Sequence, residues 1–65
     1  MAISLKAARV NAGLTQEQAA ERIGVSPGML VKWEKGKAAP SGKRIPKILD
    51  AYGVKYEDVI FISSS

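Results

Sequence analysis

The side chains that could do chemistry in this sequence are basic, and they concentrate between residues 22 and 47. This segment has a net charge of +6, whereas the segments before and after it have net charges of 0 and −2. It therefore holds the whole positive excess of a chain whose net charge is +4. Concentrated positive charge favours a polyanionic partner, either a nucleic acid or an anionic membrane surface. The alternative is a solvated lysine-rich segment without a partner.

The residue types that are missing exclude most catalytic chemistry. The chain has no cysteine and no histidine, which removes disulfides, thiolate or imidazole metal sites and nucleophiles activated by histidine. Six scattered acidic residues suggest no carboxylate pair in a pocket. We therefore expect no enzyme, no metal, no cofactor and no small-molecule ligand. No apolar run approaches the roughly 20 residues that span a bilayer, so we expect a cytoplasmic protein without a membrane partner.

Capping residues and glycines divide the chain into five expected helices. Thr15 and Gln18 form a capping box, and Ser26 followed by Pro27 repeats the signal for a helix start. Glycines follow the apolar patterns and mark the helix ends. The expected helices cover residues 4–12, 15–23, 26–35, 43–52 and 56–61, with a frayed tail at 63–65. The sequence thus predicts one all-α domain over residues 1–65, a compact five-helix bundle.

The last expected helix has an alternative. Residues 56–62 have strand propensity, but a lone strand has nothing to pair with in an otherwise helical chain. We therefore favour a helix over residues 56–61.

The two helices over residues 15–23 and 26–35 must cross steeply, because the turn between them is too short for an antiparallel arrangement. Such a crossing needs a small residue where the backbones meet, a left-handed residue in the turn and apolar side chains where the second helix rests on the first. Ala20 and Gly24 meet the first two needs. Val25, Leu30 and Trp33 meet the third. This spacing predicts a helix-turn-helix.

Over residues 4–61 the sequence resembles the Cro and phage-repressor (XRE-type) helix-turn-helix family. The resemblance lies in five spaced motifs: Gly13-Leu14-Thr15-Gln16-Glu17-Gln18-Ala19-Ala20, Ile23-Gly24-Val25-Ser26, Trp33-Glu34-Lys35-Gly36-Lys37, Pro40-Ser41 and Tyr52-Gly53-Val54. It implies a lambda-repressor-like DNA-binding domain whose third helix enters the major groove. It also implies a bacterial, phage or mobile-element source.

The same resemblance implies roles for individual residues. The family's buried ion pair falls on Arg9 and Glu34, where a guanidinium can bridge a carboxylate bidentately. Gln16, with Thr15 beside it, matches the family glutamine that binds a phosphate at a helix N-terminus. Basic residues flanking the third helix are further candidate phosphate contacts, with solvated side chains as the alternative: Lys35, Lys37, Lys43 and Arg44.

The candidate base-reading positions depart from the family. Pro27 and Gly28 occupy the first two groove-facing positions, where glutamine, arginine or serine is frequent, and they offer no side-chain hydrogen bond. Readout is therefore expected to shift to Lys32, which can donate to guanine, and to Val31 with Met29 at the edge, which can contact a thymine methyl. For Val31 and Met29 the alternative is an ordinary exposed or half-buried apolar residue.

These features predict a sequence-specific regulator of transcription, acting on the nucleoid as a repressor by occupying its operator. A homodimer on a palindromic site is expected. The apolar run near the C-terminus either forms the dimer surface or closes the monomer core: Val59, Ile60, Phe61 and Ile62. The alternative function is an antitoxin-like or antirepressor-like protein-interaction module without DNA binding, which Pro27 and Gly28 favour. The chain could also be the DNA-binding part of a longer repressor.

Overall fold

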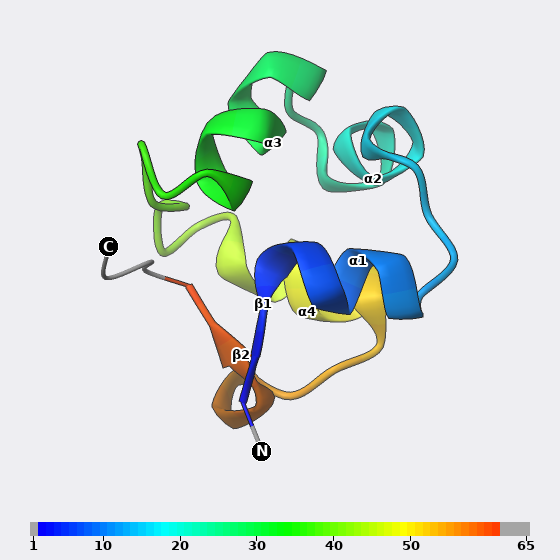
Figure 1. Ribbon diagram of the computed structural model, residues 1–65, viewed down its shortest axis with the longest axis vertical. Helices are drawn as coiled ribbons and strands as arrows, with labels where there is room; N and C mark the ends of the chain where they lie inside the picture. The colour runs from blue at the N-terminus through cyan, green and yellow to red at the C-terminus, as the bar shows by residue number, and fades with distance from the viewer. Residues whose placement is uncertain (1, 62–65) are drawn as a thin grey trace.

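Four α-helices and two short strands make up the computed structural model, which describes residues 2–61 (Figure 1). In chain order the elements are β1 (Ile3–Ser4), α1 (Leu5–Asn11), α2 (Gln16–Ile23), α3 (Pro27–Glu34), α4 (Ile45–Tyr52), a 3-10 helix (Tyr56–Asp58) and β2 (Val59–Ile60). None of the helices in this range has both the length and the apolar character needed to cross a bilayer.

Hydroxyl side chains begin the first three helices. In the capping box of α2, Thr15 Oγ1 accepts from the Gln18 amide at 3.1 Å, and the Thr15 amide donates to Gln18 Oε1 at 3.0 Å. Ser26 Oγ accepts from the Met29 amide at 3.2 Å, and Ser4 caps α1 in the same way. Each bond satisfies an amide that has no partner within its own helix. The capping residues predicted for α2 and α3, Thr15 and Ser26, are therefore confirmed as their N-caps.

Two helix starts differ slightly from the prediction. Ser4 is the N-cap of α1 and not its first residue, so the helix begins at Leu5. Residues 42–44 form a turn, and α4 begins at Ile45. Pro46 thereby falls in the first turn of α4, where its missing amide proton costs no intrahelical hydrogen bond.

The fifth helix predicted over residues 56–61 is wrong. Residues Tyr56–Asp58 form one 3-10 turn, and Val59–Ile60 form β2. β2 pairs in parallel with β1, with Ile3 opposite Val59 and Ser4 opposite Ile60. The prediction rejected a strand because no partner was visible, but the partner is the segment just before α1. Four helices and a small strand pair therefore replace the expected all-α five-helix bundle.

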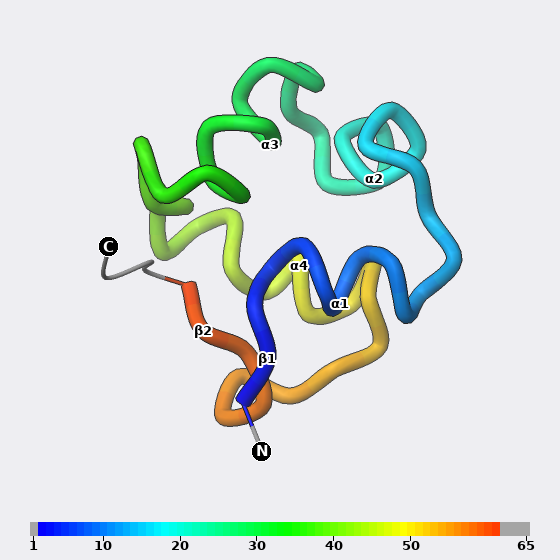
Figure 2. Tube along the Cα trace, in the orientation of Figure 1, coloured from blue at the N-terminus to red at the C-terminus, as the bar shows by residue number. Residues whose placement is uncertain are grey.

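The strand pair lies at one end of the molecule, α2 and α3 lie at the other, and α1 and α4 lie between them (Figure 2). All of these elements contribute to one hydrophobic core, in which Ile23, Leu30 and Ile48 are the largest fully buried side chains. The remaining core residues are Leu5, Ala8, Leu14, Ala19, Ala20, Trp33, Tyr52 and Val59. Because each helix buries one face here, its opposite face is set toward solvent.

Candidate nucleic-acid interface

A tight left-handed turn fixes how α3 leaves α2. Gly24 ends α2 with φ at +88°, a region that side-chain-bearing residues rarely adopt. The amides of Gly24 and Val25 both donate to the Ala20 carbonyl, at 2.8 and 3.0 Å. Arg44 adds a contact from the start of α4, with its Nη1 donating to the Gly24 carbonyl at 3.3 Å. The turn is thus held from two directions, and α3 packs against α2 directly after it.

One face of α3 rests on the core and the other faces solvent. Leu30 and Trp33 are buried, with exposed fractions of 1% and 5%. Gly28 and Lys32 lie four residues apart on the opposite, exposed face, and Lys35 continues this stripe just past the helix end. A macromolecule could therefore approach α3 along this stripe.

The apolar candidates for base reading lie on either side of that stripe. Pro27 is exposed, whereas Val31 is half-buried. Met29 is 40% exposed and lines a shallow pocket beside α3. The other residues of this pocket are Val25, Trp33, Ala39, Ser41 and Arg44. Met29 is therefore accessible at the edge of α3 and not on its most exposed line.

The basic candidates differ in their exposure and in the hydrogen bonds that they already make. Lys35, Lys37 and Lys43 are exposed, in the segment that leads from α3 to α4. Arg44 is half-buried and holds the Gly24 carbonyl. Its guanidinium has five N–H donors, so one bond to the turn leaves others available. The sequence predicted Arg44 as a phosphate contact or a solvated side chain, whereas its contact with the turn depends on the tertiary arrangement.

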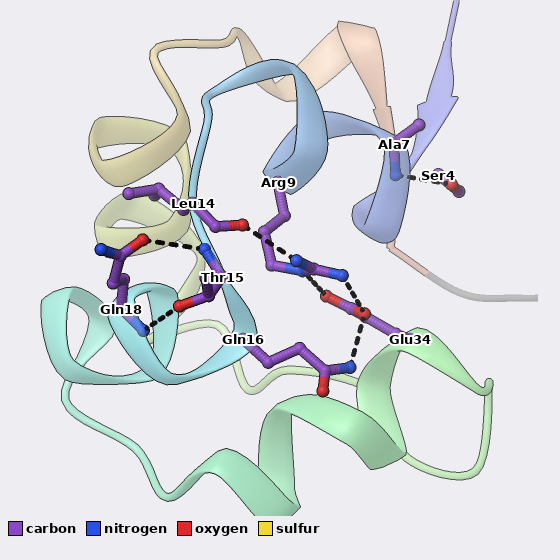
Figure 3. A network of polar contacts seen from close by, with 8 residues as sticks. All are labelled: Ser4, Ala7, Arg9, Leu14, Thr15, Gln16, Gln18 and Glu34. Carbon is purple, nitrogen blue, oxygen red and sulfur yellow. Dashed lines mark hydrogen bonds and ion pairs between the residues drawn. The ribbon is translucent and has the colours of Figure 1, made fainter.

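The polar network of Arg9, Glu34 and Gln16 ties three helices together (Figure 3). Arg9 on α1 donates through Nε and Nη2 to the two carboxylate oxygens of Glu34 on α3, at 2.7 and 3.2 Å. Its Nη1 donates to the Leu14 carbonyl at 2.9 Å. The side chains of Arg9 and Glu34 are only 10% and 4% exposed. The low dielectric of a buried site strengthens the attraction between the two charges and offsets part of the cost of their desolvation. The bidentate geometry restrains the angle between α1 and α3.

Gln16, the first residue of α2, joins this network. Its Nε2 donates to Glu34 Oε1 at 3.1 Å, and the residue is half-buried. Thr15 is exposed, but its hydroxyl is committed to the capping box. Nothing in the sequence signals the contact between Gln16 and Glu34, since the two residues are far apart along the chain and belong to different helices. Sequence reasoning missed this interaction, as it missed the contacts of Arg44 with the Gly24 carbonyl and of Arg9 with the Leu14 carbonyl.

The network also shifts the acidity of its neighbours. The hydrogen bonds to Glu34 raise the pKa of the Arg9 guanidinium, although burial opposes this effect. Burial, followed by the negative charge of Glu34, raises the pKa of Tyr52 to about 12. The Tyr52 hydroxyl is buried and has no hydrogen-bond partner among the described residues. Both Arg9 and Tyr52 therefore keep their protonated forms at neutral pH.

The expected dimer surface is only partly exposed. Val59 is 6% exposed and belongs to the core, so for this residue the structure supports the second alternative, closure of the monomer core. Its β2 position directs the side chain inward beside β1, and Ile60 on the alternate face is 50% exposed. Phe61 is half-buried and stacks on Tyr56 with ring centroids 5.3 Å apart. Ile62 lies outside the described residues.

Comparison with known proteins identifies the family. The model of the helix-turn-helix family HTH_3 matches residues 5–59. The chain belongs to this family. This confirms the resemblance to Cro and phage-repressor (XRE-type) proteins, and the match covers α1 to the first residue of β2.

Three relatives of this helix-turn-helix protein come from archaea. One from Methanocaldococcus jannaschii is 46% identical over 55 residues, which are 85% of this chain and 83% of the relative. One from Archaeoglobus fulgidus is 39% identical over 59 residues, which are 91% of this chain and 83% of the relative. A third, from Methanothermobacter thermautotrophicus, is 41% identical over 54 residues, 83% of this chain and 78% of the relative. All three are named HTH-type transcriptional regulators, and no solved structure matches the chain. The expected bacterial or phage source finds no support among them.

Proposed function

We propose that this helix-turn-helix protein is a non-catalytic, sequence-specific regulator of transcription that binds double-stranded DNA and represses by covering its operator on the nucleoid. The observation that carries the proposal is the exposed Gly28-Lys32-Lys35 stripe on a helix whose other face is anchored by Leu30 and Trp33. A rigidly held helix of this kind fits the major groove. The family and the names of its relatives support the same function.

In this proposal base reading centres on Lys32. Its ammonium group donates to guanine O6 and N7, while Val31 and Met29 contact thymine methyl groups. Pro27 and Gly28 lie nearest the N-terminus of α3. They allow its backbone to approach the DNA closely, but their side chains donate no hydrogen bond. One good polar contact discriminates between bases by only about 1 to 3 kcal/mol. DNA shape and dimer geometry therefore supply part of the specificity.

Phosphate contacts surround this base-reading face. The exposed Lys35, Lys37 and Lys43 flank α3 on one side, with Arg44 beside them. Gln16 and Thr15 lie at the N-terminus of α2, where the helix dipole favours an anion. The four basic contacts alone would lower the affinity by roughly a hundredfold or more between 50 and 200 mM salt, because only charged side chains displace the counterions of the phosphates.

The proposed active form on DNA is a homodimer on a palindromic operator, with half-sites about 34 Å apart. Ile60, with Phe61 and Tyr56 beside it, supplies an exposed apolar surface for the contact between copies. In analytical ultracentrifugation of the protein with operator DNA, Ile60→Lys should lower the fraction of operator molecules that carry two copies of the chain. Val10→Lys is the matched control, because Val10 is 56% exposed near the C-terminal end of α1. Equal losses for both variants would contradict this dimer surface.

The experiment that tests the function is selection of bound duplexes from a random pool at near-physiological salt. Enrichment of an inverted repeat is expected. On the selected site, Lys32→Ala should weaken binding more than on random DNA, whereas Lys43→Ala should weaken both similarly. Equal losses for Lys32→Ala on both duplexes would remove Lys32 from base reading.

Pro27 and Gly28 also favour a second function, a protein-interaction module without DNA binding, since neither offers a side-chain hydrogen bond to a base. An apolar protein interface responds little to salt, whereas DNA binding responds steeply. No enrichment and no retention of duplex DNA would favour this second function.

A further inference from the structure

The contact between Gln16 and Glu34 holds the side-chain amide of Gln16 in one orientation. A carboxylate only accepts hydrogen bonds, so the amide nitrogen of Gln16, and not its oxygen, must face Glu34. The 3.1 Å contact to Glu34 Oε1 meets this requirement. Figure 3 shows the amide nitrogen toward Glu34 and the amide oxygen directed away from it. One N–H of the amide is therefore used and the second is left over.

Glu34 can hold Gln16 in this way because it is itself immobilised. Its side chain is 4% exposed, and both of its oxygens accept from Arg9. The positive charge of Arg9 balances the carboxylate, so the network places no net charge behind Gln16. A phosphate at the start of α2 would consequently meet an oriented N–H donor without meeting an uncompensated negative charge.

We propose that Glu34 is a positioning residue for DNA binding, which orients the Gln16 amide so that its second N–H donates to a backbone phosphate. This inference rests on the proposed DNA-binding function and assigns a use to the ion pair beyond stability. A side chain that is already immobilised loses less entropy when it binds, and the gain for one side chain corresponds to roughly a two- to tenfold difference in affinity.

A thermodynamic cycle tests this role. The Gln16→Ala change is made in the natural chain and in the Arg9→Met/Glu34→Leu background, where the acceptor is gone but no buried charge is left unpaired. Binding is measured by fluorescence anisotropy with a labelled mixed-sequence duplex at low salt, because a phosphate contact does not depend on sequence. Lys43→Ala in both backgrounds is the control, since Lys43 is exposed and outside the network.

The inference predicts unequal costs for the same change. Gln16→Ala should weaken binding about tenfold or more in the natural chain, as expected for a hydrogen bond to a charged group. In the Arg9→Met/Glu34→Leu background the loss should be at least about threefold smaller, while the loss for Lys43→Ala stays the same. Equal losses for Gln16→Ala in both backgrounds would overturn the positioning role. No loss in the natural chain, with Lys43→Ala still weakening binding, would overturn it while DNA binding stands. Absence of duplex binding by the natural chain would instead remove the proposed function.

A second measurement on the natural chain needs no substitution. ¹⁵N relaxation of the Gln16 side-chain amide without DNA should give an order parameter near the value of about 0.85 for rigid backbone. The side-chain amide of the exposed Asn11 is the reference for a solvated group. A Gln16 order parameter below about 0.6, as in flexible segments, would overturn the inference even if the double replacement did not fold.

Discussion

Replacing Glu34 by leucine should remove most of the free energy of unfolding. The change leaves the Arg9 guanidinium buried, at 10% side-chain exposure, with the Leu14 carbonyl as its remaining partner in the network. Leaving one charge of a buried pair uncompensated costs about 3 to 5 kcal/mol. A core of this size supplies only about 3 to 5 kcal/mol in total. Glu34→Leu should therefore be largely unfolded at 25 °C.

Removing both charges should restore most of that loss. Arg9→Met/Glu34→Leu replaces the pair by apolar side chains of similar size, a change that is often neutral or stabilising. The Leu14 carbonyl loses the bond that it accepts from Arg9 Nη1, which costs about 1 kcal/mol or somewhat more. The double replacement should thus be about 1 to 2 kcal/mol less stable than the natural chain.

Urea unfolding, monitored by far-ultraviolet circular dichroism, gives the free energy of unfolding of the natural chain, of Glu34→Leu and of the double replacement. A cost below about 1 kcal/mol for Glu34→Leu, the range of exposed ion pairs, would show that the pair is not desolvated in solution. If the double replacement were as unstable as Glu34→Leu, the unpaired charge would not be the cause of the loss. The loss of the Glu34 side chain, with its packing and hydrogen bonds, would then be the cause.

Three further changes test local features of the structure. Gly24→Ala should lower the melting temperature, with a cost of about 1 to 2 kcal/mol, because φ is +88° while the added Cβ would meet only Arg44 Nη1 at an ordinary 3.6 Å. Gly28→Ala should raise it, by up to about 1 kcal/mol, since Gly28 is helical and the added Cβ meets nothing closer than 4.0 Å. Tyr52→Phe should not reduce stability at neutral pH, because the buried hydroxyl has no partner. The natural chain should lose about 2 kcal/mol more than Tyr52→Phe between pH 10 and 12 in urea titrations, because the folded pKa of Tyr52 is raised from 10.0 to about 12 and ionisation favours the unfolded state. Equal pH dependence of the two chains would contradict this.

The parts of the fold that were predicted correctly depend on neighbours in the sequence. The capping box of Thr15 and Gln18 joins residues three positions apart, so its geometry follows from the residue types alone. Gly24 ends α2 for an equally local reason. The buried face of α3 follows from the helical spacing of Leu30 and Trp33.

The parts that were predicted wrongly depend on segments distant in the sequence. The sequence predicted a helix over residues 56–61 because no partner for a strand was visible. The partner of β2 is β1, which lies far from it along the chain. For the same reason the sequence left open whether Val59 lies on a dimer surface or in the monomer core, and the structure buries it. The pairing of Arg9 with Glu34, in contrast, was predicted correctly, but from the family resemblance and not from spacing.

The sequence by itself determined where α2 and α3 begin and end, which face of α3 is buried and where the positive charge concentrates, since these depend on local hydrogen bonds and helical periodicity. Only the tertiary structure decided that the two chain ends pair as strands, that Arg44 holds the turn at Gly24 and that Gln16 donates to Glu34. Each of these contacts joins residues of different elements. They form only when core packing has brought those elements within hydrogen-bonding distance, a condition that no local pattern encodes.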